Sequence, residues 1–372
     1  MPAPLVHRLG EQMVHSSLTI AGVTARAVIA PLKRPVRTAV GTIPAAPLVL
    51  IDVRTEEGVV GRSFLFAYTP VALAPLAKLV ESVGEEIKGQ PVVPVERYAG
   101  FDRRFRLLGW QGLVGMAVAG FDMAFWDALG HAAGWPVARL LGGEPKPLPA
   151  YDSYGVVDPA VDEADILGTV ERGFKAIKIK IGDADLAHDF ATVRAVRKLI
   201  GPDIALMVDY NQSLDPPEAC RRIARLAEFD LHWVEEPVAA EDLAGHARVR
   251  AATGVRVQTG ENWWFPRDMQ KAVSVGASDF AMLDIMKIGG VTGWLRAAGL
   301  AEAASLPVSS HIFIEASAHV LAVTPTAHWL EHLDLAGAIL AEPCEVVDGK
   351  ISAKGPGLGI AWDEAAVARH AV

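Results

Sequence analysis

The sequence contains little cysteine, no long uncharged segment and no excess of positive charge. Its two cysteines, Cys220 and Cys344, are too few for a disulfide framework or a cysteine-rich zinc site. The longest segments without Asp, Glu, Lys or Arg have 15 residues, too short to cross a bilayer as a helix. With 35 basic and 44 acidic residues, the formal net charge is −9. This charge argues against nucleic acid and anionic membranes as partners.

Two further signals are missing from the sequence. Residues 1–12 carry His7, Arg8 and Glu11 where a secretory signal would have its apolar core, so we expect a cytoplasmic protein. No glycine-rich phosphate loop follows the first barrel strand predicted below, which weakens a dinucleotide-binding fold. The 372 residues are 51% hydrophobic and 21% charged, which is typical of a globular chain of two or three domains, or of one barrel with an attached module.

Residues 1–147 predict an α+β capping domain. Apolar residues at three- and four-residue steps predict helices over residues 71–88 and 115–129. Ahead of these helices, short β-branched segments typical of strands flank residues 31–44. That intervening segment contains three prolines and a glycine, so we expect a long loop that serves as an active-site lid.

Residues 148–345 alternate short apolar segments with helical stretches at a steady interval. The segments begin at Ala150, Ala176, Ala205, Leu231, Val255, Phe280 and Leu306, with 24 to 29 residues between successive starts. Strand–helix units repeated in this way indicate an α/β fold, a (β/α)7β TIM-like barrel, rather than an open sheet. We expect residues 346–372 to pack back on the capping domain.

Polar side chains stand where the apolar segments end. They are Lys178, Lys180, Asp209, Asn211, Glu235, Glu261, Asp284, His311 and Glu331. In a barrel of parallel strands, these ends meet at one face, where active sites are built. One polar strand end would be unremarkable, but the succession predicts a single site.

Lys178 and Lys180 are two residues apart, so both side chains project to the same side of a strand. An exposed edge strand is the usual setting of a Lys-x-Lys pattern, but a closed barrel has no edge. Adjacent ammonium groups lower each other's pKa, so we expect one of the two lysines to act as a base near neutral pH.

Asp209, Glu235 and Glu261 end three consecutive predicted strands, 26 residues apart. Three converging carboxylates repel one another unless a cation joins them, and an all-oxygen set suits Mg²⁺ better than zinc. A helix N-cap or a surface charge would explain any one of them alone, but not their equal spacing. Glu235 is followed by Glu236, and because side chains alternate along a strand we assign Glu235 to the site.

Asp284 and His311 end neighbouring strands. A carboxylate beside an imidazole fixes its tautomer and raises its basicity, which predicts a second general base. A buried core histidine without a chemical role is the alternative.

Residues 328–332 contain a competing motif. They match the inverted zinc-protease pattern H-x-x-E-H, which requires a helix and a third ligand downstream. Pro325 and the eighth strand expected at this position argue against that helix.

With these residues in place, the chain resembles the mandelate racemase subgroup of the enolase superfamily. The resemblance runs from Ile43 through Ile360 and includes the Lys-x-Lys, acidic and Asp–His residues. It is also carried by longer stretches at residues 46–52, 65–73, 207–215, 286–294 and 324–331.

The resemblance implies an activity and roles for these residues. The three acidic residues would hold Mg²⁺, which binds the carboxylate and α-hydroxyl of the substrate. Lys180 and His311, the latter oriented by Asp284, would be bases on opposite sides of the α-carbon. The reaction would be racemisation of a mandelate-like α-hydroxy acid by 1,1-proton transfer through an enediolate.

Substrate contacts are implied for further residues. Lys178, Asn211 and Ser153 would lie at the substrate carboxylate, and Glu331, kept protonated, would donate to the enediolate oxygen. The lid and the barrel offer an apolar wall of Val36, Val40, Ile43, Ile312 and Leu333. This wall favours an apolar substituent over a sugar acid, because the hydroxyls of a sugar acid need polar partners.

Other functions and the partners stay open at this point. A sugar-acid dehydratase on the same site is the alternative reaction, and a non-catalytic metal-binding barrel is a third possibility. The implied partners are a small carboxylate substrate and, by resemblance, further copies of the chain in an octamer. Lys33 and Arg37 in the loop and Trp264 beside Glu261 depart from the family pattern, which leaves the exact substrate open.

Overall fold

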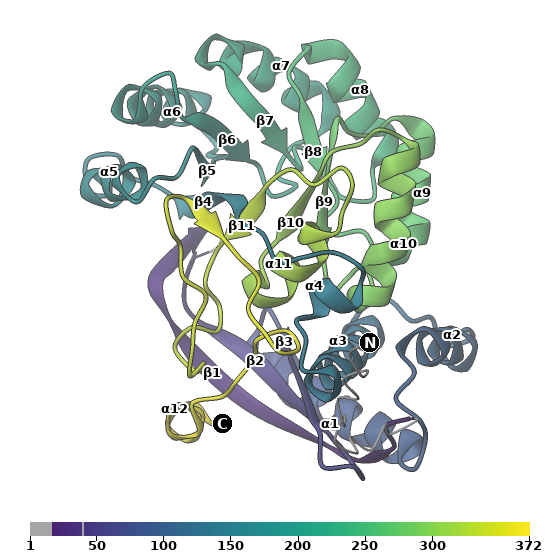
Figure 1. Cartoon of the computed structure of the whole chain (residues 1–372). Helices are drawn as coiled ribbons and strands as arrows, with labels where there is room; N and C mark the ends of the chain where they lie inside the picture. Colours follow the sequence, from purple (N-terminus) through teal and green to yellow (C-terminus); the bar gives the residue numbers. More distant parts are fainter. Residues whose placement is uncertain (1–16, 39–40) are drawn as a thin grey trace, which may run out of the picture.

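A three-stranded antiparallel sheet is the first unit along the chain (Figure 1). The computed structural model describes residues 17–38 and 41–372. Strand β1 (Ile20–Thr38) pairs with β2 (Gly41–Thr55), which pairs with β3 (Val60–Phe66).

Strand β1 runs on through residues 31–38 and β2 begins at Gly41, so the predicted loop is wrong for the described residues of this segment. The pairing shifts register inside this segment, where prolines, having no N–H group, interrupt the ladder without ending the strands. We call residues 31–38 and 41–44 the capping hairpin. Val40, predicted to belong to the apolar wall, lies outside the described residues.

Helices follow the sheet and pack against it. They are α1 (Pro70–Ile87), α2 (Pro94–Arg104), α3 (Leu113–Ala133) and the short α4 (Val137–Leu140). Helices α1 and α3 confirm the two predicted from apolar periodicity. By length and composition alone α3 could cross a membrane, but most of it is buried inside the protein, in contact with β3 and α10. Its apolar composition is therefore accounted for by core packing.

Eight parallel strands form the barrel, confirming the predicted fold. In chain order they are β4 (Leu148–Val156), β5 (Ala176–Lys180), β6 (Ala205–Asp209), β7 (Leu231–Glu235), β8 (Val257–Thr259), β9 (Phe280–Asp284), β10 (Val308–His311) and β11 (Leu330–His332). Neighbouring strands pair in the order β10-β9-β8-β7-β6-β5-β4-β11. The Ser310 N–H donates to the Trp329 carbonyl at 3.0 Å, so β10 also approaches the β11 side and the barrel is nearly closed.

Helices between the strands surround the barrel (Figure 1). They are α5 (Glu163–Glu171), α6 (Leu186–Ile200), α7 (Pro216–Leu226), α8 (Leu243–Thr253), α9 (Phe265–Val275), α10 (Gly290–Ala303) and α11 (Ile314–Ala322). Inside the barrel, the bulky side chains of Tyr151, Met207, Trp233 and Met282 are fully buried. Because these side chains fill the interior, polar groups at the carboxyl ends of the strands are available on only one face.

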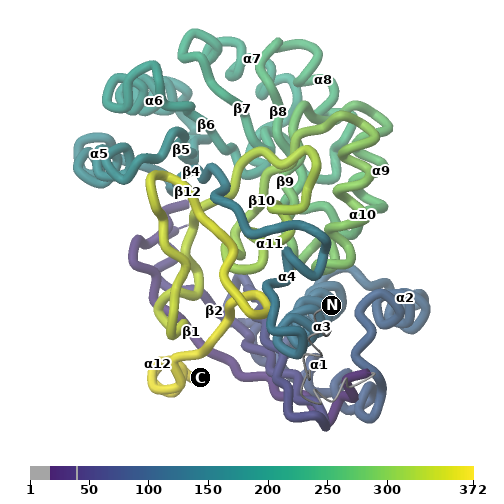
Figure 2. The backbone as a smooth tube through the Cα atoms, in the orientation of Figure 1, coloured from purple at the N-terminus to yellow at the C-terminus, as the bar shows by residue number. Residues whose placement is uncertain are grey.

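The last residues of the chain return to the antiparallel sheet (Figure 2). Strand β12 (Lys350–Ile351) pairs with β4, and α12 (Glu364–His370) lies against β1. The indole N–H of Trp362 donates to Asp52 at 2.9 Å, and the Leu358 N–H donates to Asp127 of α3 at 2.6 Å. These contacts tie the C-terminal segment to the sheet and its helices.

Gly61 of β3 lies where α3 crosses the sheet, and it gives a test of this packing. A Cβ atom at Gly61 would lie 2.0 Å from the carbonyl oxygen of Ala124 and 2.8 Å from the Cβ of Ala128. Because a helix backbone cannot yield easily, we expect Gly61→Ala to lower the free energy of unfolding by about 1–3 kcal/mol in urea denaturation. Gly100→Ala in α2, where a Cβ meets open space, is the control and should stabilise by up to about 1 kcal/mol. A Gly61→Ala protein as stable as the wild type would contradict this packing.

Candidate active site

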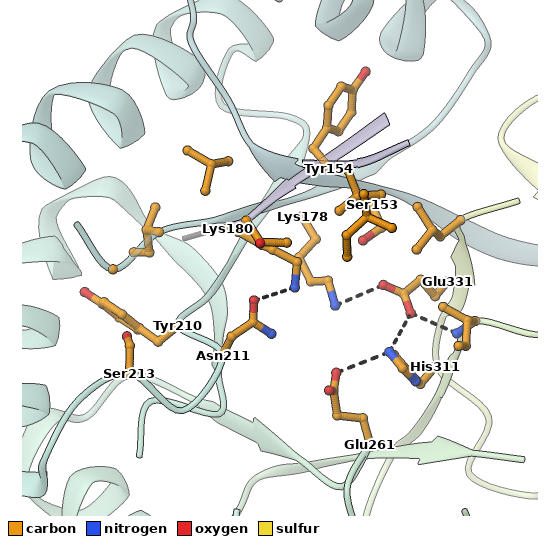
Figure 3. Close-up of a pocket in the computed structure, with 18 of the residues that line it drawn as sticks. Ser153, Tyr154, Lys178, Lys180, Tyr210, Asn211, Ser213, Glu261, His311 and Glu331 are labelled. Carbon is orange, nitrogen blue, oxygen red and sulfur yellow. Dashed lines mark hydrogen bonds and ion pairs between the residues drawn. The ribbon is translucent and has the colours of Figure 1, made fainter. Parts of the chain in front are cut away.

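A cavity of about 590 Å³ lies where the carboxyl ends of the barrel strands face the capping hairpin (Figure 3). Sequence-predicted residues that line it are Val36, Ile43, Ser153, Lys178, Lys180, Asn211, Glu261, His311, Ile312, Glu331 and Leu333. The strand ends and the capping sheet therefore enclose one site between them.

Three acidic side chains meet at the barrel mouth, as their spacing predicts. Asp209 ends β6, Glu235 ends β7 and Glu261 follows β8, and their carboxylate oxygens lie within 4.8 Å of one another. Burial raises the pKa of Glu235 well above its ordinary value, while Lys178 acts in the opposite direction. Carboxylates held this close repel one another, and an all-oxygen cluster of this kind fits a hard divalent cation such as Mg²⁺.

Glu236 is also buried beside this cluster. Its carboxylate accepts hydrogen bonds from the Asn262 amide at 2.8 and 3.1 Å, and Asn262 in turn accepts from Lys287 at 2.5 Å. Glu235 ends β7 in the acidic cluster, whereas Glu236 follows the strand and bonds to Asn262, which also donates to Glu261 at 3.3 Å. The sequence did not reveal that both side chains are buried.

The two lysines of β5 each contact the acidic cluster. The Lys178 ammonium lies 2.7 Å from Glu235 and 3.0 Å from Glu331, and Lys180 donates to Asp209 at 2.8 Å and to Asn211 at 2.5 Å. These contacts position both ammonium groups at the floor of the cavity (Figure 3).

The expected lowering of the lysine pKa values is not what this charge arrangement produces. Burial lowers the pKa of Lys180, and so does Lys178, but Asp209 and Glu261 raise it by more, so the net shift is upward. Lys178 is likewise raised well above its ordinary pKa, because Glu235 and Glu331 outweigh its burial. The prediction considered only the repulsion between the two lysines and omitted the acids that surround them.

The predicted Asp–His pair is present. His311 Nδ1 lies 2.7 Å from Asp284, whose other oxygen accepts from the backbone N–H groups of Met286 and Lys287. His311 Nε2 is on the cavity side, 3.3 Å from Glu261. Burial lowers the pKa of His311, but Glu261 and Asp284 raise it by more, so the imidazole is held more basic than usual.

Glu331 differs from the expectation that it stays protonated. Its carboxylate accepts from the Ile312 N–H at 2.9 Å and lies 3.0 Å from the Lys178 ammonium. Burial raises its pKa, but Lys178 and His311 outweigh burial and bring the pKa of Glu331 to about 2. Without substrate, Glu331 is therefore ionised, and the resemblance alone could not show this pairing.

Residues 328–332 do not form the helix that a zinc protease would need. Glu331 and His332 belong to β11, and the His332 ring bonds to Asp152 at 2.9 Å. His328 precedes β11, and its Nε2 lies 3.4 Å from that of His232. The expected eighth strand is confirmed.

Two residues noted as departures from the family pattern are directed away from the cavity. Arg37 pairs with Asp162 and donates from Nε to the Val156 carbonyl at 2.9 Å. The Trp264 ring packs beside Gly115 of α3, where an added Cβ would lie 2.9 Å from it. Among the described residues, neither is part of the cavity lining.

Several lining residues were not predicted. They include Leu32 on the hairpin, Phe66 at the end of β3, Tyr68 just after it, and Tyr154 on β4. Phe66 and Tyr68 fall in one of the stretches that carry the family resemblance, but no chemical pattern marks them. Tyr68 adopts a left-handed φ of 59°, and the Lys287 ammonium lies 4.7 Å from its ring centre.

Comparison with known proteins identifies the family. Residues 161–366 match the enolase C-terminal domain-like family, and residues 20–142 match the N-terminal domain of the mandelate racemase / muconate lactonizing enzymes. The chain belongs to the enolase superfamily, in the mandelate racemase subgroup. It is therefore an enzyme of this superfamily, and the resemblance seen in the sequence is confirmed.

The relatives within this superfamily carry out more than one reaction. A crystal structure of an enolase from Bradyrhizobium, complexed with magnesium and mandelic acid, is 62% identical, with a TM-score of 0.95 over 96% of this chain and 99% of that chain. The 3,6-anhydro-alpha-L-galactonate cycloisomerase of Streptomyces coelicolor is 32% identical over 87% of this chain and 91% of its own length. The L-talarate/galactarate dehydratase of Salmonella typhimurium is 29% identical over 82% of this chain and 77% of its own length.

The cofactor of this superfamily is Mg²⁺, as the acidic cluster predicted. Because a ligand that binds only the folded state stabilises it, a hundredfold excess of Mg²⁺ over its Kd should add about 2.7 kcal/mol to the free energy of unfolding. We expect Glu261→Ala to lose most of this gain. The measurement is thermal denaturation of each protein, compared with and without Mg²⁺. Glu228→Ala, at an exposed position, is the control and should keep it. An equal gain in Glu261→Ala would contradict the assignment of the metal site.

Proposed function

We propose that the protein is a Mg²⁺-dependent racemase of a mandelate-like α-hydroxy acid, acting by two-base 1,1-proton transfer through an enediolate. The observation that carries this proposal is the placement of Lys180 and His311. They stand on β5 and β10, at separate sides of the barrel mouth, and both side chains face the same cavity. Two bases on opposite sides of one carbon can each remove the proton that the other delivers.

The chain's own residues would divide the work as follows. Mg²⁺ held by Asp209, Glu235 and Glu261 supplies electrophilic stabilisation of the substrate carboxylate. Lys180 removes or returns the α-proton at one face of the substrate, and His311 does so at the other. Asp284 fixes Nδ1 of His311, so that Nε2 is the atom that exchanges the proton.

Other polar residues would hold the reacting carboxylate. Lys178 offers a buried ammonium, and Ser153 and Asn211 line the same part of the cavity. In the structure Asn211 already bonds to Lys180 and Asp209, so it also fixes the direction of the Lys180 side chain. A donor role for Glu331 requires the anionic substrate to raise its pKa, since a like charge nearby favours the neutral acid.

The preference for an apolar substituent is supported by the wall of the cavity. Val36, Ile43 and Leu333 line it, and Arg37 is engaged with Asp162 rather than with the interior. A phenyl group gains roughly 1.5–3 kcal/mol from burial of this kind. Each hydroxyl of a polyhydroxylated acid would instead lose about 1–3 kcal/mol if it were buried without a partner.

Sugar-acid dehydration is the second candidate function. It is favoured by the polar side chains of His188, Thr192 and Ser213, which also line the cavity. The dehydratase and cycloisomerase relatives act on sugar acids, which adds weight to this alternative.

Separate replacement of the two bases tests the proposal. If each base serves one face, His311→Asn should stop racemisation but still exchange the α-proton of the enantiomer whose proton faces Lys180. Lys180→Ala should exchange only the other enantiomer. The measurement is ¹H NMR of each enantiomer of mandelate in D₂O with Mg²⁺. Equal loss of exchange from both enantiomers in either variant would exclude this division of roles.

A further inference from the structure

A buried ion-pair hub joins the capping hairpin to the barrel beside the cavity. Asp152 of β4 is fully buried, and its two oxygens accept hydrogen bonds from Arg34 of the hairpin at 2.9 and 3.2 Å. The same carboxylate accepts from Arg172 at 2.7 Å and from Thr169 at 2.6 Å, and it bonds to His332 at 2.9 Å. Arg34 is the member of this hub that comes from the antiparallel sheet.

Arg34 makes two further contacts at the edge of the cavity. Its Nη2 donates to the Ser153 carbonyl at 2.8 Å, and its guanidinium carbon lies 3.6 Å from the centre of the Tyr154 ring. Ser153 and Tyr154 both line the cavity, as does Val36, two residues along the hairpin. One guanidinium therefore touches the barrel side of the cavity while its own strand supplies the apolar side.

We propose that Arg34 is a positioning residue, whose pairing with Asp152 and Ser153 holds the apolar wall of the hairpin in register with the end of β4. The planar guanidinium suits this task because it binds a carboxylate through two parallel hydrogen bonds and stacks on an aromatic ring at the same time. A small displacement of this wall would weaken its contact with the substituent of the bound substrate. The kinetic consequence rests on the proposed function, whereas the anchoring of the hairpin does not.

The Arg34 pair differs from the other ion pairs of β1. Arg26 pairs with Asp52 and Glu364, and none of these three residues lines the cavity. The side chains of its partners Glu364 and Asp52 are 66% and 13% exposed, whereas the Asp152 side chain is 0% exposed. Exposed pairs contribute little, and a buried carboxylate that loses a partner is costly to leave unpaired. Arg26 is thus a matched control on the same strand.

The kinetic test compares Arg34→Met with Arg26→Met, using mandelate and Mg²⁺. We expect the KM of Arg34→Met to rise about tenfold or more, with a smaller change in kcat, because a displaced wall weakens substrate positioning. Arg26→Met should stay within about twofold of the wild type in both constants. Arg34→Lys keeps the positive charge but not the planar guanidinium, so its KM should lie between those of the wild type and Arg34→Met. It replaces Arg34→Met if that variant does not fold. Unchanged KM in the Arg34 variants would overturn the positioning role.

A second measurement needs no substrate. Trypsin can cut the hairpin after Lys33, whose side chain is 80% exposed, and after Arg37, but not after Arg34, which precedes Pro35. If Arg34 anchors the hairpin, cleavage at these two bonds should be about fivefold faster or more in Arg34→Met and unchanged in Arg26→Met. Equal cleavage rates in both variants would overturn the anchoring. If the wild type does not turn over mandelate, this assay still tests whether Arg34 anchors the hairpin. Failure of the proposed reaction can therefore be distinguished from failure of the anchoring.

Discussion

Mutual repulsion among three buried carboxylates at the barrel mouth is the constraint on which the rest of the site depends. Asp209, Glu235 and Glu261 lie too close together to be stable without positive charge, and the structure surrounds them with ammonium and imidazole groups. Because every one of these cations contacts an acid, the residues proposed to move protons are positioned by the same carboxylates that are proposed to hold Mg²⁺. Their basicity therefore cannot be assigned one residue at a time.

The scaffold divides the remaining work between two units. The barrel strands place the polar groups, since each strand ends at the same face and its apolar body fills the interior. The capping hairpin of the antiparallel sheet contributes Val36 and Ile43 to the cavity lining, and Arg34 joins this hairpin to Asp152 on the barrel. The charged groups that line the site thus come from the barrel, and its apolar lining comes from both units.

The barrel and the grouping of the polar strand ends were predictable from local pattern, because a charged residue at the end of an apolar segment interrupts a regular period. The capping hairpin was not predictable in this way. Its prolines predict a loop, and strand pairing across them depends on the rest of the sheet. The pKa shifts of Glu331 and Lys180 could not be predicted from local pattern either, because they depend on distances between groups far apart in sequence. The pairing of Arg34 with Asp152 spans 118 residues, and no local pattern marks either partner.

The most direct test of the proposed reaction is to compare substrates with the wild-type enzyme in D₂O and Mg²⁺. Each enantiomer of mandelate and a set of hexarates would be followed for α-deuteration, racemisation and dehydration. We predict α-deuteration of both enantiomers of mandelate, with kcat/KM at least about a hundredfold above that for any sugar acid, since a difference of about 2.7 kcal/mol in transition-state binding suffices. Faster dehydration of a sugar acid would contradict the assignment of the protein as an aryl hydroxy acid racemase.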